Sequence, residues 1–219
     1  MPESAMWNRI GAVSGILFAI LVVISLQISL GTGETTSPTD VAGIVAIDYN
    51  QRSEDLRFGA FLMAASVFFL LWFLPFLRHR LERAQGSQGQ GHGWMPSVAY
   101  GAGITAGGML LIVATLGFAG SHVASFEGDW QVAKTLLVLR WDHLLVLAPP
   151  MAALVAATSV VSIRSGALPA WLGWISLLLV LAPMFLAPEL MTMLFLLWVI
   201  VVSVVLLYQT FSEESGYLR

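Results

Sequence analysis

The sequence contains no cysteine, and Lys134 is its only lysine, against nine arginines. The lack of cysteine excludes disulfides, thiolate metal sites and thiol nucleophiles. A single lysine outside every long apolar run argues against a retinal-type Schiff base. Charged residues make up only 11% of the chain, against roughly 25% in an average soluble domain. The net charge is −3 and no basic run is available to neutralise phosphates, so no nucleic-acid partner is expected.

Apolar residues are abundant instead, at 58% of the chain. A soluble protein could not bury so many apolar side chains and would expose large apolar patches to water, whereas in a membrane these side chains can face the lipid. Six apolar stretches are long enough, or nearly so, to cross a bilayer. The first is too long for the roughly 7–15-residue apolar region of a cleaved signal peptide. The sequence therefore predicts an all-α, six-helix transmembrane bundle formed by one integral membrane domain, residues 1–219, with spans at 10–30, 58–77, 97–119, 144–163, 169–186 and 191–208.

Two connections have a distinct composition. Ser37, Pro38 and Asp40 form a typical helix start, with a capping serine, a first-turn proline and an acid near the positive helix end. We therefore expect a short extra helix over 38–53, outside the membrane, as a lid over the span ends or as a gate or docking surface. Residues 84–93 alternate glycine with glutamine, which predicts a flexible linker on the cytoplasmic side.

The distribution of arginines predicts the orientation of the chain. With a cytoplasmic N-terminus, the inside segments hold more arginines than the outside segments, and the acids are distributed the other way. Most tryptophans fall near predicted span ends, as in the aromatic belt of membrane proteins. Both termini are therefore expected in the cytoplasm; the inside arginines are Arg9, Arg78, Arg80, Arg83, Arg164 and Arg219.

Two patterns concern how the spans pack. Pro149 and Pro150 each lack a backbone donor, so the fourth span should kink there, either as a purely structural device or to open a small polar cavity. Small residues at intervals of four in the third and fourth spans would let two helices approach closely. We predict that these spans pack together, with dimerisation as the alternative, through Ala99, Gly103 and Gly107 on one and Ala148, Ala152 and Ala156 on the other.

Five ionisable residues are expected at one depth, near the outer ends of the spans. Arg140 and His143 share a helix face, whereas Asp142 points elsewhere and needs a partner on another helix. Ionisable groups at a common membrane depth mark a candidate ligand-binding site. Three interpretations remain open: ion pairs that tie helices together, a pocket for a ligand or proton, and a metal site. The predicted cluster, called here the outer cluster, is Arg140, Asp142, His143, Glu189 and His122.

The middles of the spans contain no Asp, Glu, Lys, Arg or His. Pumps and coupled transporters usually place such groups at the midplane. A Walker loop, a GxSxG element and the HExxH spacing of zinc proteases are missing too. No cofactor, metal or catalytic residue is therefore predicted.

Three interfacial segments carry a family resemblance: Trp7-Asn8-Arg9-Ile10-Gly11, Leu71 to Arg78, and Gly166 to Trp174. They resemble small multi-span bacterial membrane proteins grouped as domains of unknown function. The resemblance implies a multi-pass protein of the bacterial cytoplasmic membrane and no catalytic activity.

Three functions stay open at this point. The leading expectation is a non-enzymatic membrane protein that binds a lipid or small amphiphile, or that acts as an accessory subunit for a protein partner in the membrane. The second is a small-solute transporter or channel that uses the outer cluster. The third is an intramembrane enzyme with His143 or His122 as base, which lacks an obvious nucleophile.

Overall fold

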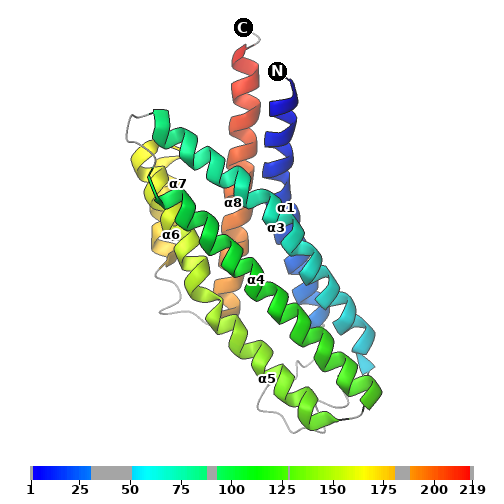
Figure 1. Ribbon diagram of the computed structural model, residues 1–219. Helices are drawn as coiled ribbons and strands as arrows, with labels where there is room; N and C mark the ends of the chain where they lie inside the picture. The colour runs from blue at the N-terminus through cyan, green and yellow to red at the C-terminus, as the bar shows by residue number, and fades with distance from the viewer. Residues whose placement is uncertain (1, 31–50, 88–92, 128, 181–187, 218–219) are drawn as a thin grey trace. The chain divides into compact units, whose positions relative to one another are not determined.

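The protein is almost entirely helical in the computed structural model, which describes residues 2–30, 51–87, 93–127, 129–180 and 188–217. No strand occurs among these residues, so the all-α prediction is confirmed. The elements are α1 (Pro2–Leu30), α3 (Ser53–Ser87), α4 (Met95–His122), the π-helix η1 (Val123–Glu127), α5 (Trp130–Val146), α6 (Ala148–Ser165), α7 (Ala170–Val180) and α8 (Pro188–Tyr217) (Figure 1).

Five helical segments are long and apolar enough to cross a membrane: Met6–Ser29, Ser53–Gly86, Met95–Ser125, Gln131–Ser165 and Thr192–Ser212. These correspond to five of the six predicted spans and make the chain a membrane-embedded helical protein. The remaining predicted span, 169–186, is described as the apolar helix α7 up to Val180. Residues 181–187 lie outside the described part.

Two predicted connections are only partly described. Almost all of the predicted outer helix over 38–53 lies outside the described residues. The linker prediction for 84–93 was wrong at its start, because α3 continues to Ser87. Glutamine and alanine favour helix, and Arg83, Ala84 and Gln85 extend the last turns of α3 before the glycines accumulate.

The helices form two compact units, described separately below. Unit 1 comprises residues 1–19, 68–107 and 148–219, and unit 2 comprises residues 20–67 and 108–147. Helices α1, α3 and α4 contribute residues to both units, whereas α6, α7 and α8 belong to unit 1 and α5 to unit 2.

In unit 1, successive helices alternate in direction. Arg9 at the start of α1 stacks on Phe211 near the end of α8, with 4.4 Å from the guanidinium carbon to the ring centroid. Arg78 at the end of α3 lies over Tyr100 at the start of α4. The beginning of α1 and the end of α8 therefore lie at the same end of unit 1 (Figure 1).

A tight turn joins α6 to α7. Gly166 has a φ of +67°, a left-handed conformation that favours glycine, and its N–H donates to the Ser162 carbonyl at 2.9 Å. Pro169 then precedes α7 and accepts from Leu172. Gly173 lets α7 approach α6 closely, because a Cβ there would lie 2.7 Å from Ile163. The two helices form a packed hairpin.

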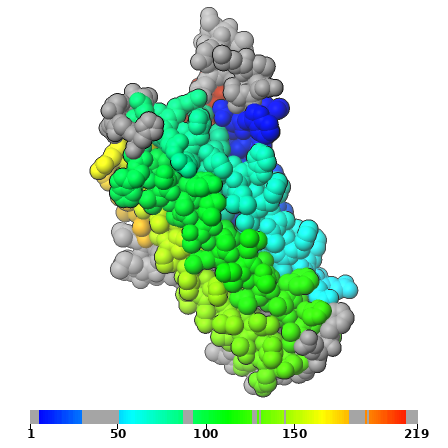
Figure 2. Space-filling model, viewed as in Figure 1, coloured from blue at the N-terminus to red at the C-terminus, as the bar shows by residue number. Residues whose placement is uncertain are grey.

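Glycines also set the packing of α1, α3, α4 and α8 in unit 1. A Cβ at Gly103 of α4 would collide with Leu74 of α3, and one at Gly15 of α1 would collide with Ser203 of α8. Leu74 and Ser203 are themselves buried. Figure 2 shows the adjoining parts of α3 and α4 side by side on the surface of unit 1. Close backbone approach at small residues is the usual basis of helix association in lipid.

The predicted small-residue face of α4 is buried at Ala99, Gly103 and Gly107. At Gly103 the close neighbour is α3. The predicted pairing of this face with Ala148, Ala152 and Ala156 stays a prediction, since those three alanines are only half-buried.

The double proline breaks the helix where the sequence predicts a kink. Helix α5 ends at Val146, Leu147 caps it, and α6 begins at Ala148. Pro149 and Pro150 have no N–H to donate to the preceding turn, and they are tolerated in the first turn of α6. The boundary between the two units falls at the same point.

Unit 2 has its own small core and polar ties. Leu56, Ala124, Ala133 and Leu137 are buried together, with Trp141 packed against them. Arg52, Arg57 and Ser25 link separate segments of this unit. Arg52 donates to the Ile28 carbonyl at 2.8 Å and so caps the end of α1, Arg57 donates to Ser125 at 2.8 Å, and Ser25 donates to the Gly59 carbonyl at 2.7 Å.

Replacing Gly103 with leucine should destabilise the protein by about 1–3 kcal/mol, because the side chain would displace Leu74. The matched control is Gly101→Leu on the same helix, where nothing lies within 4 Å of a Cβ. Thermal unfolding of the detergent-solubilised variants measures the difference. Equal melting temperatures for the two variants would contradict the close approach of α4 to α3.

Candidate functional site: a basic pocket in unit 1

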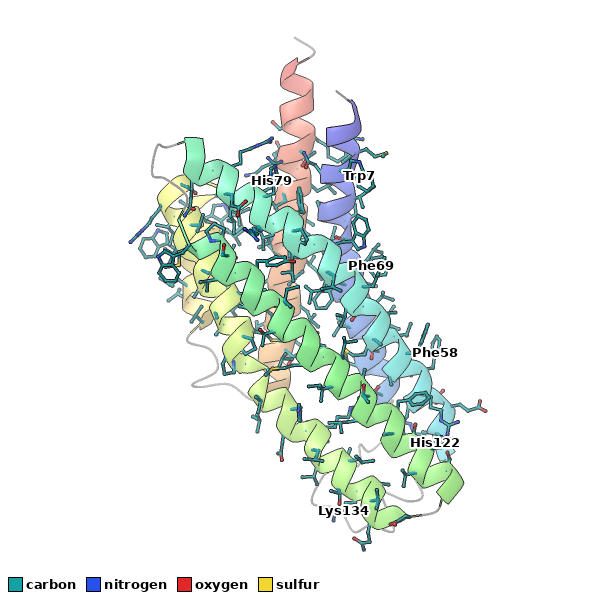
Figure 3. All side chains as sticks on the ribbon, in the orientation of Figure 1. Trp7, Phe58, Phe69, His79, His122 and Lys134 are labelled. Carbon is teal, nitrogen blue, oxygen red and sulfur yellow. The ribbon has the colours of Figure 1, made fainter. Side chains whose placement is uncertain are left out.

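Five of the nine arginines gather at the end of unit 1 where α1 begins and α8 finishes. The exposed tryptophans of this unit, at 44–69% exposure, lie in the early turns of α1 and α7, directly before α4, and in the middle of α3. Figure 3 labels Trp7 on α1 and His79 on α3 at this end. The five arginines are Arg9, Arg78, Arg80, Arg83 and Arg164, and the tryptophans are Trp7, Trp72, Trp94, Trp171 and Trp174.

The tryptophan arrangement is the one expected of an interfacial belt. Trp7 and Trp72 stack with ring centroids 6.1 Å apart and an 8° angle between planes, so α1 and α3 present an aromatic surface together. Trp198 is different, since it is buried and donates from Nε1 to Ser176 at 2.7 Å. It therefore acts inside the bundle rather than in the belt.

The last turns of α8 organise the arginine-rich end through four consecutive residues. Gln209 donates to the Ala167 carbonyl at 3.5 Å, and Thr210 accepts from Arg80 at 3.1 Å. Phe211 lies under Arg9, and Ser212 lines a pocket. One stretch of α8 thus contacts α1, α3 and the turn between α6 and α7.

That pocket, called here the basic pocket, lies within unit 1 and has a volume of about 490 Å³. It is open to one side and is formed by the end of α3, the turn after α6 and the end of α8. Its lining residues are Arg80, Arg83, Ala84, Gly166, Ala167, Gln209 and Ser212.

Helical spacing explains why two arginines of α3 line the pocket and a third does not. Arg80 and Arg83 are three residues apart and share a face of the helix. Arg78 pairs instead with Glu82 one turn later, at 2.7 Å from Nε to Oε1, and lies over Tyr100. Helix α3 therefore places Arg80 and Arg83 in the wall of the pocket, while its Arg78 forms the ion pair with Glu82.

The two arginines differ in burial, which suggests different roles. Arg80 is only 9% exposed, and its guanidinium is held by Thr210 and lies 5.9 Å from the centre of the Phe76 ring. Arg83 is exposed. Guanidinium groups bind phosphate and carboxylate in bidentate geometry. The buried Arg80, held in place, and the exposed Arg83, able to adjust its position, could therefore bind one anion together.

A second pocket, of about 380 Å³, also lies at this end of unit 1. It is lined by the start of α4 and the end of α6. Its lining is more apolar and carries one cation: Gln85, Gly93, Trp94, Met95, Val160, Val161 and Arg164.

The outer cluster is placed only in part. Arg140, Asp142, His143 and His122 belong to unit 2, whereas Glu189 belongs to unit 1 and its side chain lies outside the described residues. Figure 3 shows His122, at the end of α4, at the same end of unit 2 as Lys134, in the early turns of α5.

Individual contacts in the outer cluster are mostly local. The guanidinium of Arg140 lies against Gly117, where a Cβ would be 3.4 Å away, so α5 and α4 are close there. Nδ1 of half-buried His143 lies 3.0 Å from the Leu139 carbonyl of its own helix, and Asp142 and His122 are exposed. The convergence of the five residues stays a prediction.

Several polar groups of the spans bond within their own helices, whereas the buried hydroxyl of Ser203 has no hydrogen-bond partner among the described residues. Thr105, Thr115 and Ser176 each donate to the carbonyl four residues earlier. Within the described ranges, no three His, Asp or Glu residues come together as possible metal ligands, so the metal interpretation of the outer cluster gains no support.

Comparison with family models, curated proteins and solved structures finds no match to this chain. The resemblance to small bacterial membrane proteins therefore stays an expectation, and the candidate site depends on geometry alone.

The sequence did not single out the basic pocket. Arg80 and Arg83 were used only to predict the orientation of the chain, and Gln209 and Ser212 lie beyond the last predicted span, 191–208. One signal was available, since Arg80 and Arg83 are three apart while Arg78 and Glu82 are four apart. That spacing puts two cations on one face of the helix and places Glu82 beside Arg78 instead.

The Arg80–Thr210 bond should couple α3 to α8. Arg80→Gln and Thr210→Val should each destabilise the protein by about 1–3 kcal/mol, because each removes the hydrogen bond between the two side chains and leaves the remaining buried polar group with one hydrogen bond fewer. The double variant should lose less than the sum, with a coupling of about 0.5–3 kcal/mol. Thermal unfolding measures the cycle, with Ser212→Ala as a control, and strictly additive losses would contradict the coupling.

Proposed function

We propose that this protein is a non-enzymatic membrane protein that binds the headgroup of an anionic amphiphile in the basic pocket. The observation that carries the proposal is the placement of Arg80 and Arg83 in one pocket of about 490 Å³ at an end of unit 1. A site of that size matches known small-molecule pockets, which measure roughly 300–1,000 Å³.

The depth of the pocket in the bilayer favours a lipid over a solute. Tryptophans at the ends of transmembrane helices lie at headgroup level, and Trp7 and Trp94 lie near the starts of α1 and α4, at the end of unit 1 that also carries the arginines. A headgroup at that level could reach Arg80 and Arg83 while its chains stay in the hydrocarbon. A solute site would need polar groups deeper in the spans.

Charge favours the cytoplasmic side for this pocket. Cytoplasmic loops of membrane proteins are rich in arginine, and the cytoplasmic leaflet carries the anionic lipids that basic pockets bind. We therefore assign both termini to the cytoplasm and the protein to the cytoplasmic membrane of a bacterium. The alternation of helix direction in unit 1 supports placing both termini on one side.

Lipid binding can be tested by native mass spectrometry of the protein in nanodiscs of neutral phosphatidylcholine with a minor anionic lipid. The wild-type chain should retain anionic lipid in preference to neutral lipid. Arg83→Gln should weaken that retention about tenfold, because a charged hydrogen bond contributes roughly 1.5–3 kcal/mol.

Arg78→Gln is the matched control, since it removes the same charge from the same helix but from a residue that does not line the pocket. It should bind lipid as the wild type does. Equal losses for Arg78→Gln and Arg83→Gln would mean that general charge, and not the pocket, attracts the lipid, and the proposal would fail.

The proposed orientation has a direct test, because the chain contains no cysteine to remove first. Glu3→Cys, at the start of α1, should react with a membrane-impermeant maleimide only after the cells are opened. Gln131→Cys, at the start of α5, is exposed and should react in intact cells. The reverse labelling pattern would overturn the orientation.

A further inference from the structure

We propose that the second pocket of unit 1, called here the Trp94 pocket, binds an acyl chain whose head carries an oxyanion. The observation behind the proposal is a lining that joins one arginine and one amide to four apolar side chains, around a volume of about 380 Å³. The basic pocket has two arginines and no apolar side chain larger than alanine. The Trp94 pocket therefore suits a different chemistry, whether or not the basic pocket binds a headgroup.

The charged group of this pocket is Arg164, which lies in the last turn of α6. Its side chain is exposed, and it forms no hydrogen bond or ion pair within the described part of the chain. A guanidinium binds the paired oxygens of a carboxylate or a phosphate in bidentate geometry. An oxyanion is therefore the group that Arg164 can recognise.

The neutral polar group is the amide of Gln85, near the end of α3. This amide lies so close to Gly93 that a Cβ there would be 2.8 Å from Oε1. Oε1 is buried and has no hydrogen-bond partner among the described residues, whereas buried polar atoms are normally satisfied by protein, water or a ligand. Because a turn of the amide exchanges its oxygen and nitrogen, Gln85 can donate to an oxyanion or accept from a hydroxyl beside it.

The remaining walls suit an acyl chain. Val160 and Val161 come from α6, Met95 begins α4, and Trp94 directly precedes it. Trp94 is 69% exposed, and an exposed indole at a helix end lies at headgroup level in a membrane. A small anion without a chain would leave these four side chains uncovered. An amphiphile covers them with its chain while its head meets Arg164.

A free fatty acid and an anionic phospholipid share this chemistry, because a carboxylate and a phosphate offer the same pair of oxygens. The full-length protein is placed in phosphatidylcholine nanodiscs with one photoactivatable probe that carries a diazirine in its acyl chain. The probes are stearic acid, phosphatidylglycerol and, as the neutral probe, phosphatidylcholine. Mass spectrometry of peptides then locates the crosslinks, and labelling at 93–95 and 160–164 reports on the Trp94 pocket.

We expect stearic acid or phosphatidylglycerol to label these residues about fivefold more than phosphatidylcholine does, because Arg164 forms charged hydrogen bonds with the anionic head. Labelling by stearic acid alone assigns the pocket to a fatty acid, and labelling by phosphatidylglycerol assigns it to a phospholipid. Excess unlabelled probe should suppress the signal. Arg164→Gln should remove the preference for the anionic probe, and Val160→Phe should lower all labelling because the ring fills the pocket.

Arg83→Gln serves as the comparison, because it removes the same charge at the same end of unit 1 from a residue that does not line the Trp94 pocket. It should leave the labelling unchanged. Equal labelling by all three probes would mean that lipid merely surrounds the helices there, and the proposal would be overturned. Equal losses in Arg83→Gln and Arg164→Gln, or a signal that unlabelled probe does not suppress, would overturn it too. Retention of lipid through Arg83 is measured separately, so the proposed function and this proposal can fail independently.

Discussion

The whole structure depends on the inability of hydrocarbon to hydrogen-bond the peptide backbone. Each span must satisfy its backbone groups internally, so only helices remain possible for a chain of this composition. Proline is accommodated where helices begin or break, as at Leu147 before Pro149 and Pro150. Hydroxyl groups follow the same rule: buried Ser159, Ser162 and Ser176 donate to carbonyls of their own helices. Polar side chains therefore add few links between spans, and small residues must supply the packing.

The same constraint drives cations to the helix ends, where they acquire more than one role. At the end of unit 1, Arg9 stacks on Phe211, Arg78 holds Glu82, and Arg80 bonds Thr210. Each of these contacts fixes how a helix is oriented, either against its neighbour or within itself, because apolar faces alone do not select one orientation in lipid. The basic pocket is a consequence of this concentration of arginine, because Arg80 and Arg83 face it together. The arginines that predict the orientation of the chain thus also line the candidate site.

Periodicity and length sufficed for much of the fold. The apolar runs predicted the helices, and the double proline predicted the break at Leu147, because both follow from local backbone chemistry. The ends were less predictable, since Ala84 and Gln85 continue α3 although glycines follow. A close helix contact was predicted at Gly103, but its neighbour there is Leu74 of α3 and not the predicted fourth span, and no contact was predicted at Gly11 and Gly15, whose spacing of four is as clear in the sequence. Their neighbours, Phe76 of α3 and Ser203 of α8, come from distant parts of the chain.

The sequence by itself determined a membrane-embedded, all-helical chain with arginine and tryptophan at the helix ends, because bilayer thickness and backbone satisfaction act on each segment separately. Tertiary structure alone decided which of those arginines share a pocket. Gln209 and Ser212 join Arg80 and Arg83 only because α8 packs along the end of α3, a contact across about 130 residues of chain. No local pattern specifies such a partner, since side-chain packing between distant helices chooses it.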